Sequence, residues 1–460
     1  MKKYKVIVIG AGPSGLFSCL ELTKAGIGPI LLIEQGKDIY ERTNRSGKDL
    51  LCGWGGAGAF SDGKLTLSPD VGGFLGEIIP RKEVKNLLQQ ADDIFLSFGA
   101  PAKTYSPPGK VLENLEIQAK LAQMEFIYSP IRHLGTENCV RVLTNIREYL
   151  QDKIDIRTET KVDQIVLESG QAKGVRLPSR EVLRGEYVIA APGRVGASWM
   201  KKEAARLGLT ATPNPVDLGV RVEVPAAVMQ KLTDVVYEAK LIYYSQTFDD
   251  RIRTFCMNPY GEVVSEAVDG LISVNGHSYA EKRSENTNFA LLVSSRFTEP
   301  FDDPIGYGRA IVSLANLLGS GVIVQRLGDL LAGRRTTEKR LSRCITRPTL
   351  PEATPGDLSF VFPYRHLKNI MEMLEALERI VPGVYSRHTL LYGVEVKFYS
   401  HRIRLNTELE SEAKNLFVTG DGSGITRGLI QASVSGLVAA RAIIKRHKGQ
   451  PRKNSNLMNS

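Results

Sequence analysis

One short segment at the start of the chain constrains its fold more than any other. Residues 5–9 are mostly β-branched, as in a buried parallel strand, and they lead directly into the GAGPSG motif of residues 10–15. A helix is expected to follow as far as Ala25, with a second apolar strand over residues 30–33. This order predicts a βαβ unit, whose glycines allow a tight turn and bring a pyrophosphate close to the helix N-terminus.

An acidic residue, Glu34, ends the second predicted strand. At this distance from the glycines, a carboxylate accepts hydrogen bonds from the hydroxyls of an adenosine ribose, and its charge would repel a 2′-phosphate. The segment therefore predicts a dinucleotide cofactor. By itself it does not distinguish FAD from NAD.

Two further segments favour FAD. Residues 53–64, GWGGAGAFSDGK, contain so many small side chains that the backbone can lie flat against a bulky planar ligand. Much later, residues 415–422 form an apolar strand that ends in Gly420-Asp421, and a helix of small residues follows. The aspartate can accept a hydrogen bond from a ribityl hydroxyl, and the helix N-terminus would point its positive end at the pyrimidine edge of a flavin.

Alternating residues between positions 161 and 194 predict a β-meander. Its last strand, YVIAAPGR at residues 187–194, is expected to return to the nucleotide-binding sheet. An NAD dehydrogenase needs neither the meander nor the terminal Gly-Asp, so the sequence predicts FAD. The central region has no second strand-GxGxxG-helix unit, so NADH or NADPH, if it is the electron donor, would bind without a Rossmann domain of its own.

With these segments, the chain resembles the two-dinucleotide-binding flavoprotein superfamily, and most closely the group called FAD-dependent or NAD(FAD)-utilising dehydrogenases. The motifs that carry the resemblance are GGAGAFSDGKL (55–65), AAPGR (190–194), GVRVEVP (219–225), VNGHS (274–278), GVEVKFYSHRIR (393–404) and residues 420–428. The resemblance implies that Val162 contacts the adenine through its backbone, and that residues 400–402 lie beside the isoalloxazine. Related sequences often have Ser-Pro where this chain has Ser400-His401.

The expected FAD site combines these segments. Its residues are Gly10, Gly12, Pro13, Ser14, Gly15, Glu34, Gln35, Gly55, Gly56, Ala57, Gly58, Ser61, Asp62, Gly63, Lys64, Val162, Ala191, Pro192, Gly193, Gly420, Asp421, Gly424, Ile425 and Thr426. The expected fold class is α/β, with a Rossmann-like FAD-binding domain built on a parallel sheet with a β-meander, and a mixed α+β substrate domain. The expected division is 1–200 and 387–447 for FAD binding, 201–386 for the substrate, and 448–460 as a disordered basic tail.

Composition narrows the class of function. The five cysteines contain no CxxC or CxxxxC pair, which argues against a disulfide framework, a zinc site and a dithiol relay, and the six histidines show no metal-binding spacing. No apolar run reaches the roughly 18 residues of a membrane span, and the first strand leaves no room for a signal peptide, so a cytoplasmic protein is expected. The net charge of +10 lies partly in the tail and forms no dense stripe, so no nucleic-acid partner is expected.

A flavin exchanges hydride at its own N5, so the protein must mainly position a substrate and supply a proton or an anion-binding group. The resemblance places His401 and Arg402 near the flavin, with Tyr399 as a weaker candidate and His277 as a second choice. The leading hypothesis is hydride transfer between flavin N5 and a C–C or C–N bond of a small organic substrate. A flavin monooxygenase, a flavoprotein acting on RNA and covalent flavin attachment through Cys52 stay open, as do the electron partner and the oligomeric state.

Overall fold

The computed structural model describes residues 3–43, 51–61, 63–268, 270–278, 283–297, 300–301 and 303–449. It divides into two compact units. Unit 1 contains Met1–Thr104, Pro130–Asn214 and Tyr399–Ser460, and unit 2 contains Tyr105–Ser129 and Pro215–Phe398. Asp62 and residues 450–460, which make up most of the expected basic tail, lie outside the described residues.

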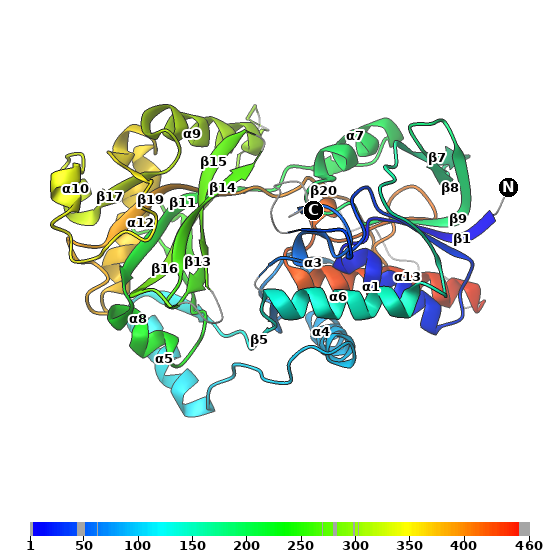
Figure 1. Cartoon of the computed structure of the whole chain (residues 1–460), viewed down its shortest axis with the longest axis horizontal. Helices are drawn as coiled ribbons and strands as arrows, with labels where there is room; N and C mark the ends of the chain where they lie inside the picture. The colour runs from blue at the N-terminus through cyan, green and yellow to red at the C-terminus, as the bar shows by residue number, and fades with distance from the viewer. Residues whose placement is uncertain are drawn as a thin grey trace. The chain divides into compact units, whose positions relative to one another are not determined.

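Unit 1 is built on a seven-stranded sheet in the order β6-β2-β1-β9-β8-β7, with β21 also paired to β9. The strands are β1 (Lys3–Ile9), β2 (Ile30–Ile33), β6 (Asp155–Arg157), β7 (Gln164–Glu168), β8 (Gln171–Arg176), β9 (Val182–Ala190) and β21 (Leu416–Val418). Strands β6, β2, β1, β9 and β21 pair in parallel, whereas β7, β8 and β9 form an antiparallel meander (Figure 1). The predicted parallel sheet with a β-meander is confirmed.

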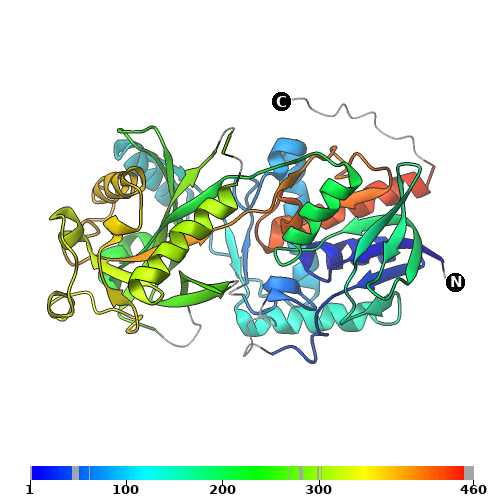
Figure 2. The same ribbon diagram turned by 90° about the horizontal axis from the view of Figure 1, so that it is seen from above.

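Helices cover one face of this sheet. Alternate residues of β1, among them Val6 and Val8, are buried in a core that includes side chains of α1 (Pro13–Lys24), α4 (Arg81–Ser97), α6 (Thr136–Leu150) and α13 (Leu429–His447). Helices α1 and α13 lie side by side (Figure 1 and Figure 2). Tyr4, Ile7 and Ile9 of β1 lie in a second core with the meander and α7 (Ala197–Leu207). Smaller elements are α3 (Leu75–Ile78) and the paired strands β3 (Lys64–Thr66) with β5 (Ile131–His133) and β10 (Ala211–Thr212) with β20 (Arg402–Ile403).

Unit 2 has an eight-stranded sheet in the order β18-β17-β19-β11-β16-β13-β12-β4, antiparallel except for β17 with β18. Its strands are β4 (Met124–Ile127), β11 (Val216–Pro225), β12 (Lys240–Tyr244), β13 (Arg251–Asn258), β16 (Asn286–Ser295), β17 (Ile323–Arg326), β18 (Thr354–Pro355) and β19 (Leu390–Lys397). A hairpin adds β14 (Glu262–Val268) and β15 (Leu271–His277). The helices are α5 (Gly109–Leu121), α8 (Ala226–Thr233), α9 (Pro304–Gly319), α10 (Leu327–Leu331), α11 (Glu338–Leu341) and α12 (Tyr364–Leu377).

The division of the chain differs in detail from the expected one. The change of unit occurs at Asn214 and Tyr399, so α7 belongs to unit 1. Residues 105–129 belong to unit 2, because β4 completes its sheet by pairing with β12. Within the described residues, no helix is both long enough and apolar enough to cross a membrane.

Candidate functional site

The glycine motif between β1 and α1 is fixed by close backbone contacts. A Cβ on Gly15 would lie 1.9 Å from the carbonyl oxygen of Gly10, and one on Gly10, whose φ is +98°, would lie 2.2 Å from that of Ala191. At Gly12, by contrast, a Cβ would meet nothing within 4 Å. Gly12 caps α1 without any side-chain hydrogen bond, and Pro13 starts the helix. The first-turn N–H groups of α1 are therefore left for a ligand, and open space lies beside Gly12.

Glu34 organises the turn from the end of β2. Its side chain is buried, and its Oε2 accepts the N–H of Ala11 at 2.8 Å. Its Oε1 accepts the N–H groups of Gly36 at 2.9 Å and Gly53 at 3.1 Å, and the Cys52 thiol lies 3.7 Å from the same oxygen. Since a carboxylate oxygen accepts about two hydrogen bonds, Oε2 keeps capacity for a hydroxyl. Burial, and then Glu34, raise the pKa of Cys52 to about 11, which keeps the thiol protonated and disfavours the covalent link left open above.

The glycine-rich segment after residue 52 lies directly on the first turn. The N–H of Gly55 donates to Ala11 O at 2.7 Å, and a Cβ on Gly56 would lie 3.2 Å from the Cα of Gly12. A Cβ on Gly55 or Gly58 would instead meet a leucine methyl group at 2.3 Å. These two glycines thus let the segment pack closely against helices α6 and α13, and a Cβ at either position would require the leucine side chain to shift.

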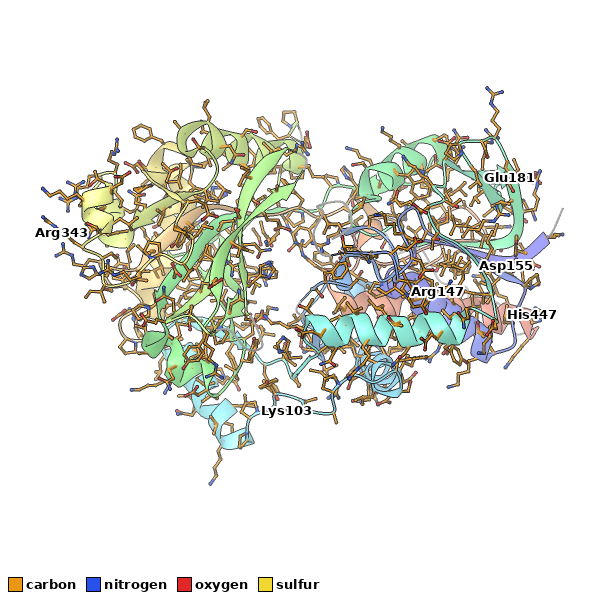
Figure 3. The ribbon with its side chains drawn as sticks, viewed as in Figure 1. Lys103, Arg147, Asp155, Glu181, Arg343 and His447 are labelled. Atoms are coloured by element: carbon orange, nitrogen blue, oxygen red, sulfur yellow. The ribbon has the colours of Figure 1, made fainter. Side chains whose placement is uncertain are left out.

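Neighbouring groups hold this segment in place. Arg147 of α6 (Figure 3) contacts the Trp54 ring and pairs with Asp38 at 2.8 Å. The Ser61 hydroxyl donates to Gly58 O at 2.9 Å, and Lys64 is in β3. Gln35 is exposed, and Ala57 is in the short helical turn Gly56–Gly58.

The expected adenine contact, Val162, is buried beside the end of β2. The preceding residues run along Glu34, because Thr160 N donates to Glu34 O at 2.9 Å. Within the described residues, neither the N–H nor the C=O of Val162 has a hydrogen-bond partner. Both backbone groups are available to a base.

The segment that follows β21 contacts the glycine turn of residues 10–15. Ser14 Oγ donates to Thr419 Oγ1 at 2.8 Å, and a Cβ on Gly422 would lie 2.7 Å from Pro192 and 2.8 Å from Gly193 O. Asp421 Oδ1 accepts the Thr426 hydroxyl at 2.9 Å, and burial raises the pKa of the Asp421 carboxyl. Residues 10–15, 55–58, 191–193 and 420–426 therefore meet at the ends of parallel strands β1, β9 and β21.

Several backbone N–H groups in this segment have no acceptor among the described residues, and two of them follow each other directly. Ile425 and Thr426 are buried, and their N–H groups have no acceptor within the part of the chain that the structure describes. Buried N–H groups are nearly always hydrogen-bonded, so an unpaired pair indicates a missing acceptor.

Sequence reasoning missed the two supports of this turn. On one side, Phe74 N donates to Ile425 O at 2.7 Å, and Arg427 N donates to Gly72 O at 2.5 Å. On the other side, the amide of Asn214 donates to Gly424 O. The pair Gly72-Gly73, both with positive φ, was a signal in the sequence, whereas Asn214 gave none.

The expected catalytic residues lie next to the same turn. A Cβ on Gly424 would lie 2.6 Å from the carbonyl oxygen of His401. Arg402 Nη1 pairs with Glu77 Oε2 at 2.5 Å. The guanidinium of Arg427, which was not predicted, lies over the Tyr399 ring at 4.1 Å. His277 is an exposed residue at the end of β15 in unit 2, and no group of potential metal ligands occurs among the described residues.

Comparison with known proteins identifies the cofactor. Residues 215–398, which coincide with the second segment of unit 2, match the family described as "FAD-dependent protein, C-terminal domain-like". The match covers less than half of the chain, and it supports FAD as the cofactor. FAD acts by oxidation and reduction, which is the chemistry of an oxidoreductase.

Other similarities are more distant. The chain is 27% identical to an uncharacterized protein of Clostridium beijerinckii, over 96% of this chain and 81% of the relative. Among solved structures, L-proline dehydrogenase from P. horikoshii has a TM-score of 0.41 at 11% identity, covering 98% of this chain and 100% of that one. Aquifex aeolicus GidA has a TM-score of 0.38 at 13% identity, covering 98% and 64%.

The residues present fit FAD. The uncapped N-terminus of α1 and the space beside Gly12 suit the pyrophosphate, the remaining capacity of Glu34 suits a ribose hydroxyl, and the N–H groups of Ile425 and Thr426 suit a flavin acceptor edge. When bound, FAD supplies hydride exchange at its N5 atom. Asp421, beside these donors, has the acceptor oxygens for a ribityl hydroxyl.

Proposed function

We propose that the protein transfers hydride between flavin N5 and a C–C or C–N bond of a small organic substrate. The observation that carries this proposal is the unpaired N–H pair of Ile425 and Thr426. Fixed donors stabilise the negative charge that gathers around N1 and the C2 carbonyl on two-electron reduction, and they need no reorganisation to do so.

We propose that His401, Arg402 and Tyr399 act on the substrate. One of the five guanidinium N–H groups of Arg402 is used by Glu77, so donors remain for a polar or anionic substrate group. His401 carries an imidazole ring, a group that can act as a general acid or base. The Tyr399 ring, with Arg427 over one face, would limit the space on this side.

An anaerobic screen of the purified protein tests the proposal. NADH, NADPH and a set of reduced and unsaturated organic compounds are added, and the visible absorbance of the bound flavin is followed. The proposal expects bleaching by one donor and recovery when a C=C or C=N compound is added without oxygen. Recovery only with oxygen, together with hydroxylated product, would contradict it and favour a monooxygenase.

A further inference from the structure

Asn214 lies where it can control the direction of the backbone N–H group of Ile425. It lies between β10 and β11, it is buried, and nothing in the sequence singles it out. Its Nδ2 donates to the carbonyl oxygens of both Ser400 and Gly424, each at 2.8 Å. Both hydrogens of one amide are therefore used to join two loops that are far apart in the sequence.

The two loops are in direct backbone contact. Gly424 has a φ of +73°, and a Cβ there would lie 2.6 Å from His401 O and 2.7 Å from Ser400 O. The carbonyl groups of Ser400 and Gly424 both point at one amide nitrogen, and two carbonyl oxygens that converge without a donor would repel each other. Asn214 supplies the donor that allows this arrangement.

Planarity of the peptide bond connects Asn214 to the unpaired donors. The C=O of Gly424 and the N–H of Ile425 belong to one trans peptide unit and point in opposite directions. Holding Gly424 O therefore fixes the direction of the Ile425 N–H. In the same way, the Phe74 N–H holds Ile425 O and so fixes the Thr426 N–H.

We infer that Asn214 is a positioning residue that raises the reduction potential of the bound FAD by aiming the Ile425 N–H. The inference rests on the proposed function, because it takes the flavin to be the acceptor of this N–H. When the carbonyl of Gly424 loses its donor, the peptide can rotate, and the negative charge of the reduced cofactor loses more stabilisation than the neutral oxidised form does.

The test is the midpoint potential of the FAD-loaded full chain, measured by anaerobic dye titration. The variant Asn214→Asp replaces the donor by an acceptor of the same shape, and Asn214→Ser keeps one hydroxyl donor. The matched control is Asn145→Asp, because the Asn145 amide also donates to a backbone carbonyl, Phe98 O, at 2.9 Å, but lies on α6. Dissociation constants for oxidised FAD are measured in parallel.

The expected result is that Asn214→Asp binds reduced FAD at least tenfold less well relative to oxidised FAD, which lowers the midpoint potential by about 30 mV. Asn214→Ser should restore part of the shift, and Asn145→Asp should show none. An unchanged potential in both Asn214 variants, or an equal shift in the control, overturns the inference. Loss of oxidised FAD from both Asn214 variants also overturns it, because Asn214 would then hold the cofactor in either state. Absence of FAD from the unmodified chain would instead overturn the proposed function.

Discussion

The carboxylate of Glu34 accepts a hydrogen bond from the backbone N–H of Ala11 at 2.8 Å. The contact joins the end of β2 to the glycine turn, and Gly36 and Gly53 donate to the other oxygen of the same carboxylate. Glu34 therefore shapes the turn in the absence of a ligand, and we propose that its remaining acceptor capacity binds a ribose hydroxyl. The backbone N–H of Ala11 thus depends on Glu34 for its acceptor, although the sequence pattern assigns Glu34 only to the cofactor.

Glu34→Ala should weaken both the turn and the proposed contact with FAD. A hydrogen bond to a charged group contributes about 1.5 to 3 kcal/mol, so the affinity for FAD should fall roughly ten- to a hundredfold. The cofactor-free protein should also unfold at lower denaturant concentration, because three backbone N–H groups lose their acceptor. Fluorescence titration with FAD and urea unfolding measure the two effects. If the variant binds FAD as tightly as the unmodified chain does, Glu34 does not contribute to FAD binding.

Two glycines of one motif should behave differently. Gly15→Ala should prevent the turn from forming, since its Cβ would lie 1.9 Å from Gly10 O. Gly12→Ala should leave the stability of the cofactor-free protein unchanged, because its Cβ meets nothing within 4 Å. Its methyl group would nevertheless occupy the place expected for the pyrophosphate, so FAD binding should weaken at least about tenfold, or 1.4 kcal/mol.

Gly109→Ala is the matched control for these two variants, because its Cβ also meets nothing within 4 Å and it lies on α5 in unit 2. It should not lower stability, and it should leave FAD affinity unchanged. If Gly12→Ala binds FAD as tightly as Gly109→Ala does, the pyrophosphate does not lie at the N-terminus of α1.

Local patterns predicted the first unit well. The β-branched residues 5–9, the GAGPSG turn and the apolar residues 30–33 determine a βαβ unit through short-range periodicity, and β1, α1 and β2 lie there. In unit 2, the motif GVRVEVP (219–225) lies within β11.

Long-range pairing was not predictable. The assignment of residues 105–129 to unit 2 depends on Leu241 of β12 meeting Phe126 of β4, and no local pattern encodes that partnership. The same holds for Arg221 and Glu395, which belong to two motifs noted in the sequence. They form a fully buried pair at 2.6 Å. Burial alone would raise the pKa of Glu395, but the positive charges of Arg221 and Lys397 outweigh burial and hold this pKa below its usual range.

Arg402→Ala should leave FAD bound and lower turnover at least about tenfold, the effect of losing roughly 1.4 kcal/mol of transition-state stabilisation. Glu77→Gln removes the negative partner of Arg402 but leaves the positive charge of Arg402 in place, so it should not lower turnover. Steady-state kinetics with the donor found in the anaerobic screen measures both. Undiminished turnover in Arg402→Ala and in His401→Ala would move the chemistry to unit 2, with His277 as the next candidate.

His366 should make stability depend on pH. Burial lowers its pKa to about 4, and its Nε2 lies 3.1 Å from Ser295 Oγ. In the unfolded chain His366 binds a proton below about pH 6.5, whereas in the folded chain it does so only below about pH 4. The free energy of unfolding therefore decreases as pH falls from about 6.5 to about 4, by about 3 kcal/mol in all. His366→Gln should flatten this dependence in urea unfolding, whereas the same change at the exposed His447 (Figure 3) should not. Equal slopes in all three proteins would show that His366 is not buried in its neutral form.

We expect residues 10–15, 55–58, 191–193 and 420–426, which are distant in the sequence, to hold one FAD. The most direct measurement is to denature the purified protein, separate the released cofactor by chromatography, and compare its amount with that of the chain. We expect one molecule of FAD per chain, released without proteolysis because the raised pKa of Cys52 disfavours a covalent link. Release of FMN or NAD in place of FAD, or of no flavin from protein that has been supplied with FAD, would contradict it.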